Sequence, residues 1–463
     1  MTKLFIVYLR SKRFVMLASA LTGLYVFAWC TKWTFDPYTV GSFWPGRFFT
    51  AQADSILQAR LWVNPADIPG ECFYLDGQCY GYFGLFPSLL RIPFVILLGP
   101  TIPELTALFI SIAASITFWA ALDLCRRVVD QTCPKFSTVP SVFMLVSALA
   151  LGPASVLILL SDPYVYQEAI VWSLTGTLVG INLMWRWWSE RVQWQLVGSM
   201  FAFVCAASAR PTAAGIAFVI ALGLFWVSRL RQRLDRKTLL LALTLSVLPV
   251  FAAGGSLFLK FDQLTTPFES YEGMSTSYWP EILEANDGVV TGARFVPTGL
   301  LVFLRPDSLH ISSQWPWIRY RFGGGLEQIT FLPPLQKGSM YQEQTTSISN
   351  AMPLAFLLTI TITSILVRRR RRNFELVLLG ALCTPIVVTA LNFGVSARYL
   401  GDAYPLVAVG MALSGSLIPQ FQGLSKRFRN RITGAIVVIS LFSLLAMPML
   451  ATQYAWIYRF GIR

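Results

Sequence analysis

The residues best suited to acid–base chemistry lie in one polar segment near the start of the chain, residues 31–83. This segment carries five carboxylates, at Asp36, Asp54, Asp67, Glu71 and Asp76. The whole chain contains one histidine, His310. A histidine-rich metal site therefore cannot form, and a Ser-His-Asp triad or Cys-His pair is not expected. Any general acid or base must therefore come from Asp, Glu, Lys, Arg, Tyr or Cys.

The composition shows what kind of protein must position these groups. Of 463 residues, 55% are hydrophobic and 13% are charged, whereas a typical soluble domain carries about 25% charged residues. The mean hydropathy is +0.58. These values exclude a soluble enzyme, a disordered chain and a disulfide-rich miniprotein, and they indicate an all-α polytopic membrane protein. The net charge of +14 lies mostly in short segments between apolar runs, so topology explains it and we expect no nucleic-acid partner.

Apolar runs near the ~20 residues needed to cross a bilayer predict about eleven transmembrane helices. They are residues 14–30, 103–124, 139–160, 164–186, 195–209, 212–228, 239–259, 351–367, 374–393, 403–420 and 432–452. With eleven spans, the N-terminus and all the internal basic clusters fall on one face, which the positive-inside rule makes cytoplasmic. Residues 85–99 contain Arg91 and two prolines. They could form a twelfth span, and an interfacial or re-entrant helix fits them better.

Residues 1–463 then form a single transmembrane domain with two long loops on the outer face, residues 31–83 and 260–350. Long loops between helices usually carry function. Aromatic residues, prolines and arginines alternate in the second loop. They could form an interfacial aromatic belt or a groove for a lipid-linked or carbohydrate ligand.

Asp54 is the first candidate for a general base. Residues 44–61, WPGRFFTAQADSILQARL, predict a helix lying along the membrane face, with Asp54 in its middle. Arg47 lies seven residues earlier, about two turns away, so both residues should share a face. A carboxylate beside a cation at the bilayer surface can deprotonate an incoming hydroxyl. An ordinary solvated aspartate is the alternative.

Further ionisable residues lie at helix ends that reach the outer face in this topology. They are Asp162 and Glu168 in SDPYVYQEAIVW, Arg210 in SARPT, and Arg398 with Tyr399 and Asp402 in SARYLGD. Ionisable residues at such depths are costly and often functional. Arginines beside carboxylates would suit a phosphate leaving group and a sugar hydroxyl, and arginines snorkelling to the interface are the alternative.

Two of the seven cysteines lie in a polar context. Cys72 and Cys79 flank a turn in GECFYLDGQCYG. A local disulfide closing this hairpin is expected if the loop faces an oxidising compartment, and two free thiols are the alternative.

An ordered set of segments resembles the GT-C superfamily of membrane glycosyltransferases, and more narrowly the bacterial members related to dolichyl-phosphate-mannose-type protein mannosyltransferases. The segments are AQADSILQARLWV, YLDGQCYGYFGLFPSLLRIPF, ASARPTAAG and GVSARYLGDAYPLV. The chain departs from the family where many relatives place an acidic pair just after the first helix, because Trp44-Pro45-Gly46 stands there. The catalytic carboxylate is therefore left between Asp54 and Asp36.

The resemblance implies transfer of a hexosyl or pentosyl group, with inversion, from a polyprenyl-phosphate carrier to a glycan, lipid or protein acceptor. The reaction would face the outside of a bacterial inner membrane, with the carrier phosphate near Arg210 or Arg398. Some members of the family also bind a divalent cation.

Two other functions stay open: a polysaccharide polymerase or ligase that uses diphosphate-linked glycans, and a lipid-carrier transporter. A first-loop helix packed beside the turns of Arg210 and Arg398 would favour the transferase. A cavity centred on residues 294–321 would favour the polymerase.

Overall fold

The protein is described here from a computed structural model. It covers residues 3–36, 47–103, 105–133, 138–152, 165–231, 234–264, 266–267, 270–272, 284, 288–320, 341–342, 346–369, 373–392, 394–395 and 399–460. Asp162 and Arg398, two of the expected site residues, lie outside the described residues, as does Trp44-Pro45-Gly46.

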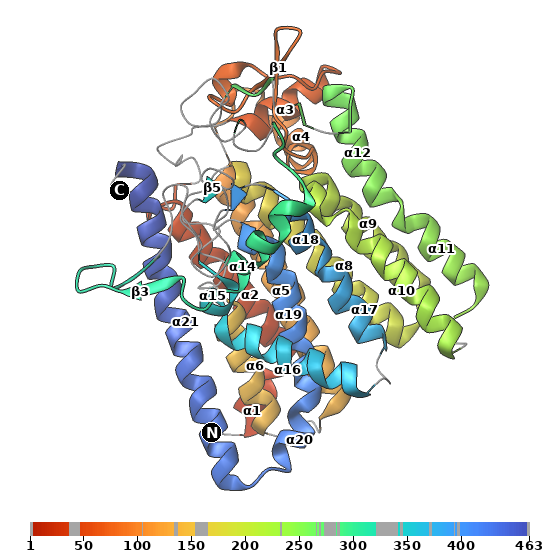
Figure 1. Ribbon diagram of the computed structural model, residues 1–463, viewed down its shortest axis with the longest axis vertical. Coiled ribbons are helices and arrows are strands. Elements are labelled where there is room, and N and C mark those ends of the chain that lie inside the picture. Colours follow the sequence, from red (N-terminus) through yellow and green to blue (C-terminus); the bar gives the residue numbers. More distant parts are fainter. Residues whose placement is uncertain are drawn as a thin grey trace.

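The fold is a bundle of long helices that run side by side (Figure 1). The helices of the bundle are α2 (Lys12–Cys30), α5 (Thr106–Thr132), α6 (Thr138–Leu151), α8 (Val165–Glu190), α9 (Gln193–Ala209), α10 (Gly215–Arg231), α11 (Arg236–Ser246), α12 (Leu248–Phe261), α16 (Pro353–Arg369), α17 (Asn373–Leu382), α18 (Thr384–Ala390), α19 (Leu400–Ser414) and α21 (Lys426–Phe460). The short helices α1 (Lys3–Leu9) and α20 (Ile418–Gln422) lie toward one end. A helix lies in or across each of the eleven predicted ranges.

Small residues let the central helices approach closely. Helix α8 packs against α9, and a Cβ added to Gly176 would overlap the backbone of Ala202 and Ala206. Gly180 packs in the same way on the ring of Phe203. Small residues at helix contacts are typical of membrane bundles, where backbone approach replaces the hydrophobic effect as the source of affinity.

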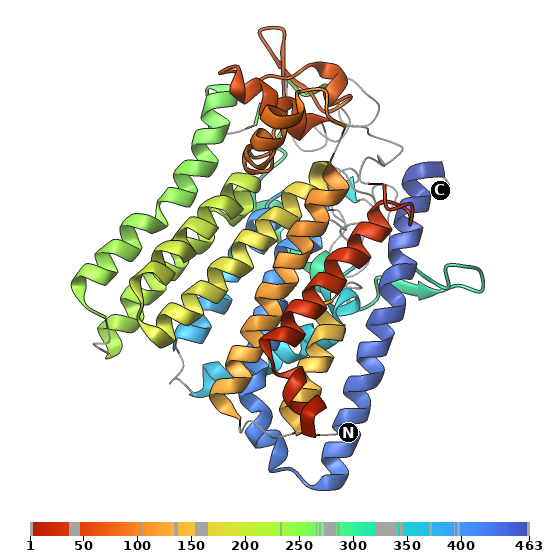
Figure 2. The ribbon, with the colours of Figure 1, turned by 180° about the vertical axis from the view of Figure 1, so that it is seen from behind.

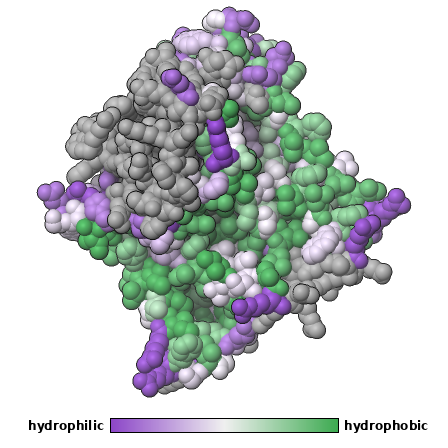
Figure 3. Space-filling model, in the orientation of Figure 1, coloured by the Kyte–Doolittle hydropathy of each residue, from purple (hydrophilic) through white to green (hydrophobic). Residues whose placement is uncertain are grey.

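The chain is a multi-pass membrane protein. Among the described residues, six helical stretches are long and apolar enough to cross a membrane: Lys12–Cys30, Thr106–Thr132, Pro211–Arg229, Arg236–Phe261, Leu400–Gln422 and Arg427–Gln453. Apolar residues cover much of the side of the bundle, and hydrophilic residues gather toward its ends and projecting edges (Figure 3). The count of eleven spans stays a prediction.

The first polar segment folds into a cap at one end of the bundle (Figures 1 and 2). It contains α3 (Phe48–Leu57), η1 (Pro65–Asp67) and the antiparallel hairpin β1 (Phe73–Leu75) and β2 (Gln78–Tyr80). Helix α3 is shorter than the predicted range 44–61, because the backbone of Ala59 turns to a positive φ of 56°. Residues 85–99 form α4 (Phe86–Leu98), which has 13 residues and is too short to cross a bilayer alone.

The second polar segment is only partly described. It contains η5 (Ala293–Phe295), α14 (Val296–Leu304), the antiparallel hairpin β3 (Leu309–Ile311) and β4 (Ile318–Tyr320), the strand β5 (Tyr341–Gln342) and α15 (Ile348–Ala351). Strand β5 pairs in parallel with β6 (Gly394–Val395), just before α19. The second segment therefore contacts the chain near the Arg210 and Asp402 region described below.

An ionic network ties the N-terminal helices to α5 at the opposite end. Arg10 pairs with Asp130 at 2.8 Å, and Arg126 pairs with Asp123 at 2.6 Å and with Asp130 at 3.0 Å. Arg127 also contacts Asp123, at 2.6 Å. Arg126 and Arg127, which the sequence presents as simple topology signals, are therefore also structural residues.

Candidate functional site

A polar cluster where α9, α18 and α19 end or begin is built around Asp402, which is 5% exposed. Its Oδ2 accepts a hydrogen bond from Arg210 Nη2 at 2.8 Å and a short one from the Thr389 hydroxyl. Its Oδ1 accepts from the Thr212 hydroxyl at 3.2 Å. Both carboxylate oxygens are thus engaged, so Asp402 is suited to positioning Arg210 and not to accepting a proton from substrate.

Three chain breaks bring these residues together. Helix α9 ends at Ala209, and Arg210 follows as an extended residue because Pro211 cannot continue the helix. The turn η2 (Pro211–Ala213) presents Thr212, and Thr389 comes from the last turn of α18. Asp402 lies in the first turn of α19. Residues 192 positions apart therefore meet in one ion pair.

One edge of the Arg210 guanidinium is held and the other is open. Nε donates to Thr212 at 3.2 Å and Nη2 to Asp402, and the Tyr399 ring lies 5.4 Å from Cζ. No described residue accepts a hydrogen bond from Nη1, and the side chain is 16% exposed. A fixed guanidinium with free N–H groups is a ready donor to a phosphate or carboxylate.

The second polar segment packs over this cluster from the side of α18. The Gly292 N–H donates to the Leu391 carbonyl at 2.8 Å, and Thr291 pairs with Asn392. A Cβ added to Gly299 in α14 would lie 3.0 Å from Cα and Cβ of Ala390. The chain on either side of Thr389 is therefore fixed by the second polar segment.

Gly84, which directly follows the first polar segment, packs on the end of α9. Gly84 lies so close to the last turn of α9 that a Cβ would overlap the carbonyl oxygens of Ser208 and Ala209. Only glycine fits at position 84, and the contacted residue Ala209 directly precedes Arg210 at the end of α9. The chain just after the first polar segment therefore lies beside the Arg210 turn. The first-loop helix α3 packs on α4, and Arg398 lies outside the described residues, so this contact does not meet the arrangement that would favour a transferase.

The expected pairing of Arg47 with Asp54 is not formed. The Arg47 guanidinium donates to the Pro100 carbonyl, and Asp54 Oδ2 instead accepts from Gln58 Nε2 at 2.7 Å. Asp54 is half-buried on α3, whose other face packs on α4 through the Ser88 hydroxyl and Gln52 at 2.7 Å. Asp36 is exposed beyond the end of α2. Asp54 keeps one carboxylate oxygen without a described partner, so it stays a candidate base.

Glu168 has a different role from the expected one. It is fully buried in α8, where it forms a bidentate pair with the equally buried Arg91 of α4, at 2.5 and 2.8 Å. The Arg91 guanidinium also lies 4.4 Å from the ring centroid of Phe109. Glu168 therefore fixes α4 on the bundle, and it does not point to an open substrate site.

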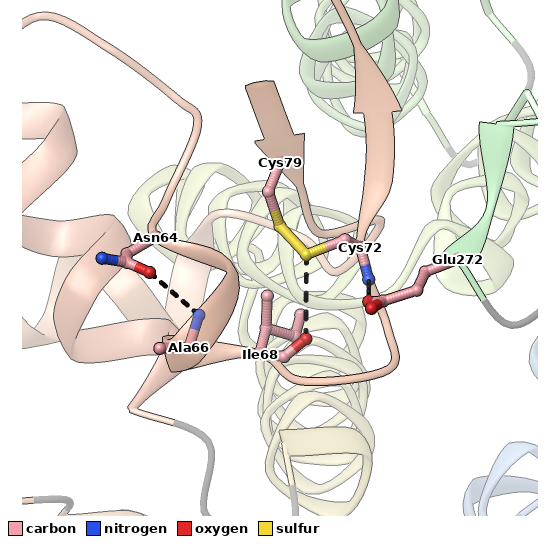
Figure 4. Close-up of a disulfide and its surroundings, with 6 residues drawn as sticks. All are labelled: Asn64, Ala66, Ile68, Cys72, Cys79 and Glu272. Atoms are coloured by element: carbon pink, nitrogen blue, oxygen red, sulfur yellow. Dashed lines mark hydrogen bonds between the residues drawn. A yellow bond between two sulfur atoms is a disulfide. The ribbon is translucent and has the colours of Figure 1, made fainter. Parts of the chain in front are cut away.

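A disulfide joins Cys72 and Cys79 across the first-loop hairpin (Figure 4). The turn between the strands is Asp76-Gly77, both at positive φ, as a two-residue hairpin requires. Burial raises the pKa of Tyr74 and Tyr80 in this hairpin, with further contributions from the carboxylates of Glu272 and Asp76, respectively. Neither phenol is therefore suited to act as a base near neutral pH.

The hairpin in turn holds the start of the second polar segment. The Glu272 N–H donates a hydrogen bond to the Cys72 carbonyl at 2.7 Å. The Glu272 carboxylate accepts one from the Cys72 N–H at 3.4 Å (Figure 4). The Tyr271 ring stacks on Phe73 with centroids 4.8 Å apart. Lys260, at the end of α12, donates to the carbonyls of Gly81 and Phe83 at 2.9 and 2.6 Å. The two polar segments therefore form one connected cap.

Sequence reasoning missed several partners. It did not identify Thr212 and Thr389 as ligands of Asp402, nor Arg91 as the partner of Glu168. A buried arginine in an apolar run was the one available signal. Within the described residues, no three His, Cys, Asp or Glu side chains gather as a metal site would require, so these residues offer no ligand set for the divalent cation that some members of the resembled family bind.

Solved structures with the same fold come from archaeal oligosaccharyltransferases. The apo enzyme of Archaeoglobus fulgidus is 14% identical, with a TM-score of 0.53 over 95% of this chain. A form of it tethered to an acceptor peptide containing an NVT sequon is 15% identical, with a TM-score of 0.53 over 96% of the chain. The AglB enzyme from the same organism, in complex with an inhibitory peptide and a dolichol-phosphate, is 12% identical with a TM-score of 0.51.

This chain spans only 55–56% of the length of those structures. A scan against protein-family models found no match, and neither did a search of curated proteins. The likeness therefore concerns the fold, which this chain shares with the archaeal oligosaccharyltransferases.

Proposed function

We propose that this chain is a glycosyltransferase of the GT-C type. It would move a sugar from a polyprenyl-phosphate carrier to an acceptor, with inversion at the anomeric carbon. The observation that carries the proposal is the open edge of Arg210, fixed by Asp402 at a helix end against which Gly84, just after the first polar segment, packs. The AglB structure with a dolichol-phosphate supports a lipid-linked phosphate as ligand of this fold.

Arg210 would bind the carrier phosphate and stabilise the negative charge that builds up as the sugar departs. Asp402 contributes by holding the guanidinium in one orientation before the donor arrives, which reduces the reorganisation needed in the transition state. Arg398 and Tyr399 are proposed to extend this phosphate site. Asp162 is proposed to contact the sugar.

Asp54 would accept the proton of the acceptor hydroxyl as the anomeric carbon is attacked from the face opposite the leaving phosphate. Asp36 is the alternative base on the same polar segment. The acceptor would be a glycan, lipid or protein, and the structures with bound peptides give some support to a protein acceptor for the fold. The transferred group would be a hexosyl or pentosyl unit, and the reaction would face the outside of a bacterial inner membrane.

The test is transfer by the purified full-length chain in vesicles, with radiolabelled polyprenyl-phosphate sugars and a membrane extract as acceptor. Label that moves into the extract supports the proposal, and analysis of the labelled product gives its acceptor class. The Arg210→Lys variant should lose sugar transfer. Lysine keeps the positive charge, but it has no planar guanidinium that could donate to Asp402 from one edge and to a phosphate from the other. Arg229→Ala, at an exposed arginine near the end of α10, is the matched control.

Two results would redirect the proposal. Transfer only from diphosphate-linked oligosaccharides would identify a polymerase or ligase. Movement of the labelled carrier across the bilayer without any transfer would identify a transporter.

A further inference from the structure

The hairpin of β3 and β4 projects sideways from the bundle beside α21, away from the cap and from the Arg210 cluster (Figures 1 and 2). It exposes large apolar side chains at its far end. Ile311 is 88% exposed, and Trp315 and Trp317 are 46% and 52% exposed. The two tryptophan rings pack edge to face, 5.0 Å apart. Such side chains in water would be costly, so something apolar must cover them.

The strand register gives the hairpin two different faces. Leu309 pairs with Tyr320 and Ile311 pairs with Ile318, so the side chains of Leu309, Ile311 and Ile318 share one face. His310 pairs with Arg319 on the other face. The hairpin is therefore amphipathic, with an apolar face and a polar, basic face.

The base of the hairpin is rigidly mounted. The Ser308 hydroxyl contacts those of Thr346 and Ser347 at 2.8 and 3.2 Å, and Asn350 Nδ2 donates to Ser308 Oγ at 2.8 Å. Arg305 is 3% exposed and forms a bidentate pair with Asp307 just before the strand. These contacts fix the direction of the hairpin relative to α15. The position of its exposed end is therefore determined by the fold.

The tip is ordered by its own arginine. Arg319 donates to the carbonyls of Gln314, Trp315 and Pro316, at 3.3, 2.9 and 3.0 Å. The loop carbonyls are thus satisfied by a side chain of the same hairpin. A loop whose backbone carbonyls are hydrogen-bonded can enter an apolar phase at a lower free-energy cost than a loop whose carbonyls have no partner.

The neighbouring helix identifies what covers the exposed end. Strand β4 packs against α21, and Leu309 and Ile318 lie against the core of the bundle. Helix α21 includes the membrane-crossing stretch Arg427–Gln453, of which one third is buried. Most of this stretch is therefore exposed at the side of the bundle, where lipid would lie, and Ile311 with the tryptophan tip extends that surface outward.

We infer that the 309–320 hairpin inserts Ile311 and its tryptophan tip into the lipid interface beside α21. Tryptophan favours this region because its ring is apolar and its N–H can reach headgroups or water. His310 and Arg319 then face the aqueous or headgroup side. The hairpin acts as a lateral anchor that sets the depth and tilt of the bundle next to α21.

The test measures nitroxide accessibility at Ile311→Cys in the full-length chain, in vesicles of phosphatidylcholine and phosphatidylglycerol. The background is Cys383→Ser, because Cys383 is an exposed free thiol. Collision with lipid-soluble oxygen should exceed collision with the water-soluble nickel chelate. The nickel accessibility should be at least about threefold below that of a label at Lys237→Cys, an exposed site in a basic segment. A label at Leu441→Cys, 49% exposed on α21, is the lipid-facing reference.

The adjacent position supplies the sharpest control. A label at His310→Cys should show clearly higher nickel accessibility than one at Ile311, because the two side chains lie on opposite faces. Nickel accessibility at Ile311 equal to that at Lys237 would overturn the inference, and so would equal values at positions 310 and 311. The measurement uses no donor or acceptor, so its failure would leave the proposed activity untouched.

Discussion

Replacing Glu168 by glutamine should weaken folding severely while leaving the proposed phosphate site in place. The substitution keeps the side-chain size but removes the negative charge that faces Arg91, and both side chains are fully buried. Removing one partner of a buried ion pair typically costs about 3–5 kcal/mol, because the remaining charge is left without compensation. No discount for solvent screening applies, since water reaches neither group.

The magnitude can be separated from ordinary packing loss by a double-variant cycle. Glu168→Gln and Arg91→Met should each lower the free energy of unfolding by about 3–5 kcal/mol. The double variant should lose much less than the sum, because neither charge then remains buried. Glu190→Gln is the matched control. Its side chain is 44% exposed and lies 3.8 Å from Arg127, so its loss should stay below about 1 kcal/mol.

Equilibrium unfolding of the purified chain in mixed micelles, followed by helical circular dichroism, measures these differences. Donor binding is measured on the folded fraction of the same samples. If Glu168→Gln unfolds like the wild type but no longer binds donor, Glu168 is a ligand-binding residue, as first expected from the sequence, and the structural role is wrong.

Other outcomes can be checked on the same preparation. Asp54→Asn should reduce turnover about 10²–10⁴-fold through loss of the proton acceptor while donor binding survives. Arg210→Lys should weaken donor binding by about tenfold to a hundredfold, since a charge-assisted hydrogen bond is lost. Mass spectrometry of unreduced peptides should find Cys72 and Cys79 protected from alkylation. A reporter fused to the C-terminus should be active outside the cytoplasm if eleven spans separate the two ends.

Each of these predictions has a distinct contrary result. Wild-type turnover in Asp54→Asn together with an inactive Asp36→Asn would move the base to Asp36. If neither matters, the base must be sought at Asp162. Loss of donor binding in Arg398→Ala but not in Arg210→Lys would move the phosphate site to Arg398. Two alkylated thiols would exclude the disulfide, and a reporter active only in the cytoplasm would exclude the topology.

The sequence predicts the helices well because the physical requirement is local. A bilayer demands long apolar runs, and these are visible without knowing what packs against them. The first-loop hairpin is equally local, because Asp76-Gly77 is a strong turn signal between two short strands. The short helix at residues 85–99 could also be predicted, since its length and its arginine argue against a full span.

The partners of the polar residues could not be predicted in the same way. Arg210 and Asp402 are 192 residues apart, and Arg91 and Glu168 are 77 residues apart. Which ends of which helices meet is decided by packing in three dimensions, and a charge at a helix end looks the same in sequence whether it binds a ligand or another side chain. Glu168 and Arg47 illustrate this, because both were grouped with ligand-binding residues and both have partners within the chain.

The tie between Arg10 and Asp130 sets an order of events during synthesis. The two residues are 120 positions apart, so the first helices are made long before their partner on α5 exists. At about 5–20 residues per second, that delay is roughly 6–24 s. Until α5 begins to pack against α2 late in this interval, the N-terminal helices lack their partner in the bundle. The start of the chain therefore becomes fixed only when α5 is completed, and an early truncation before residue 130 would leave it unanchored in the nascent protein.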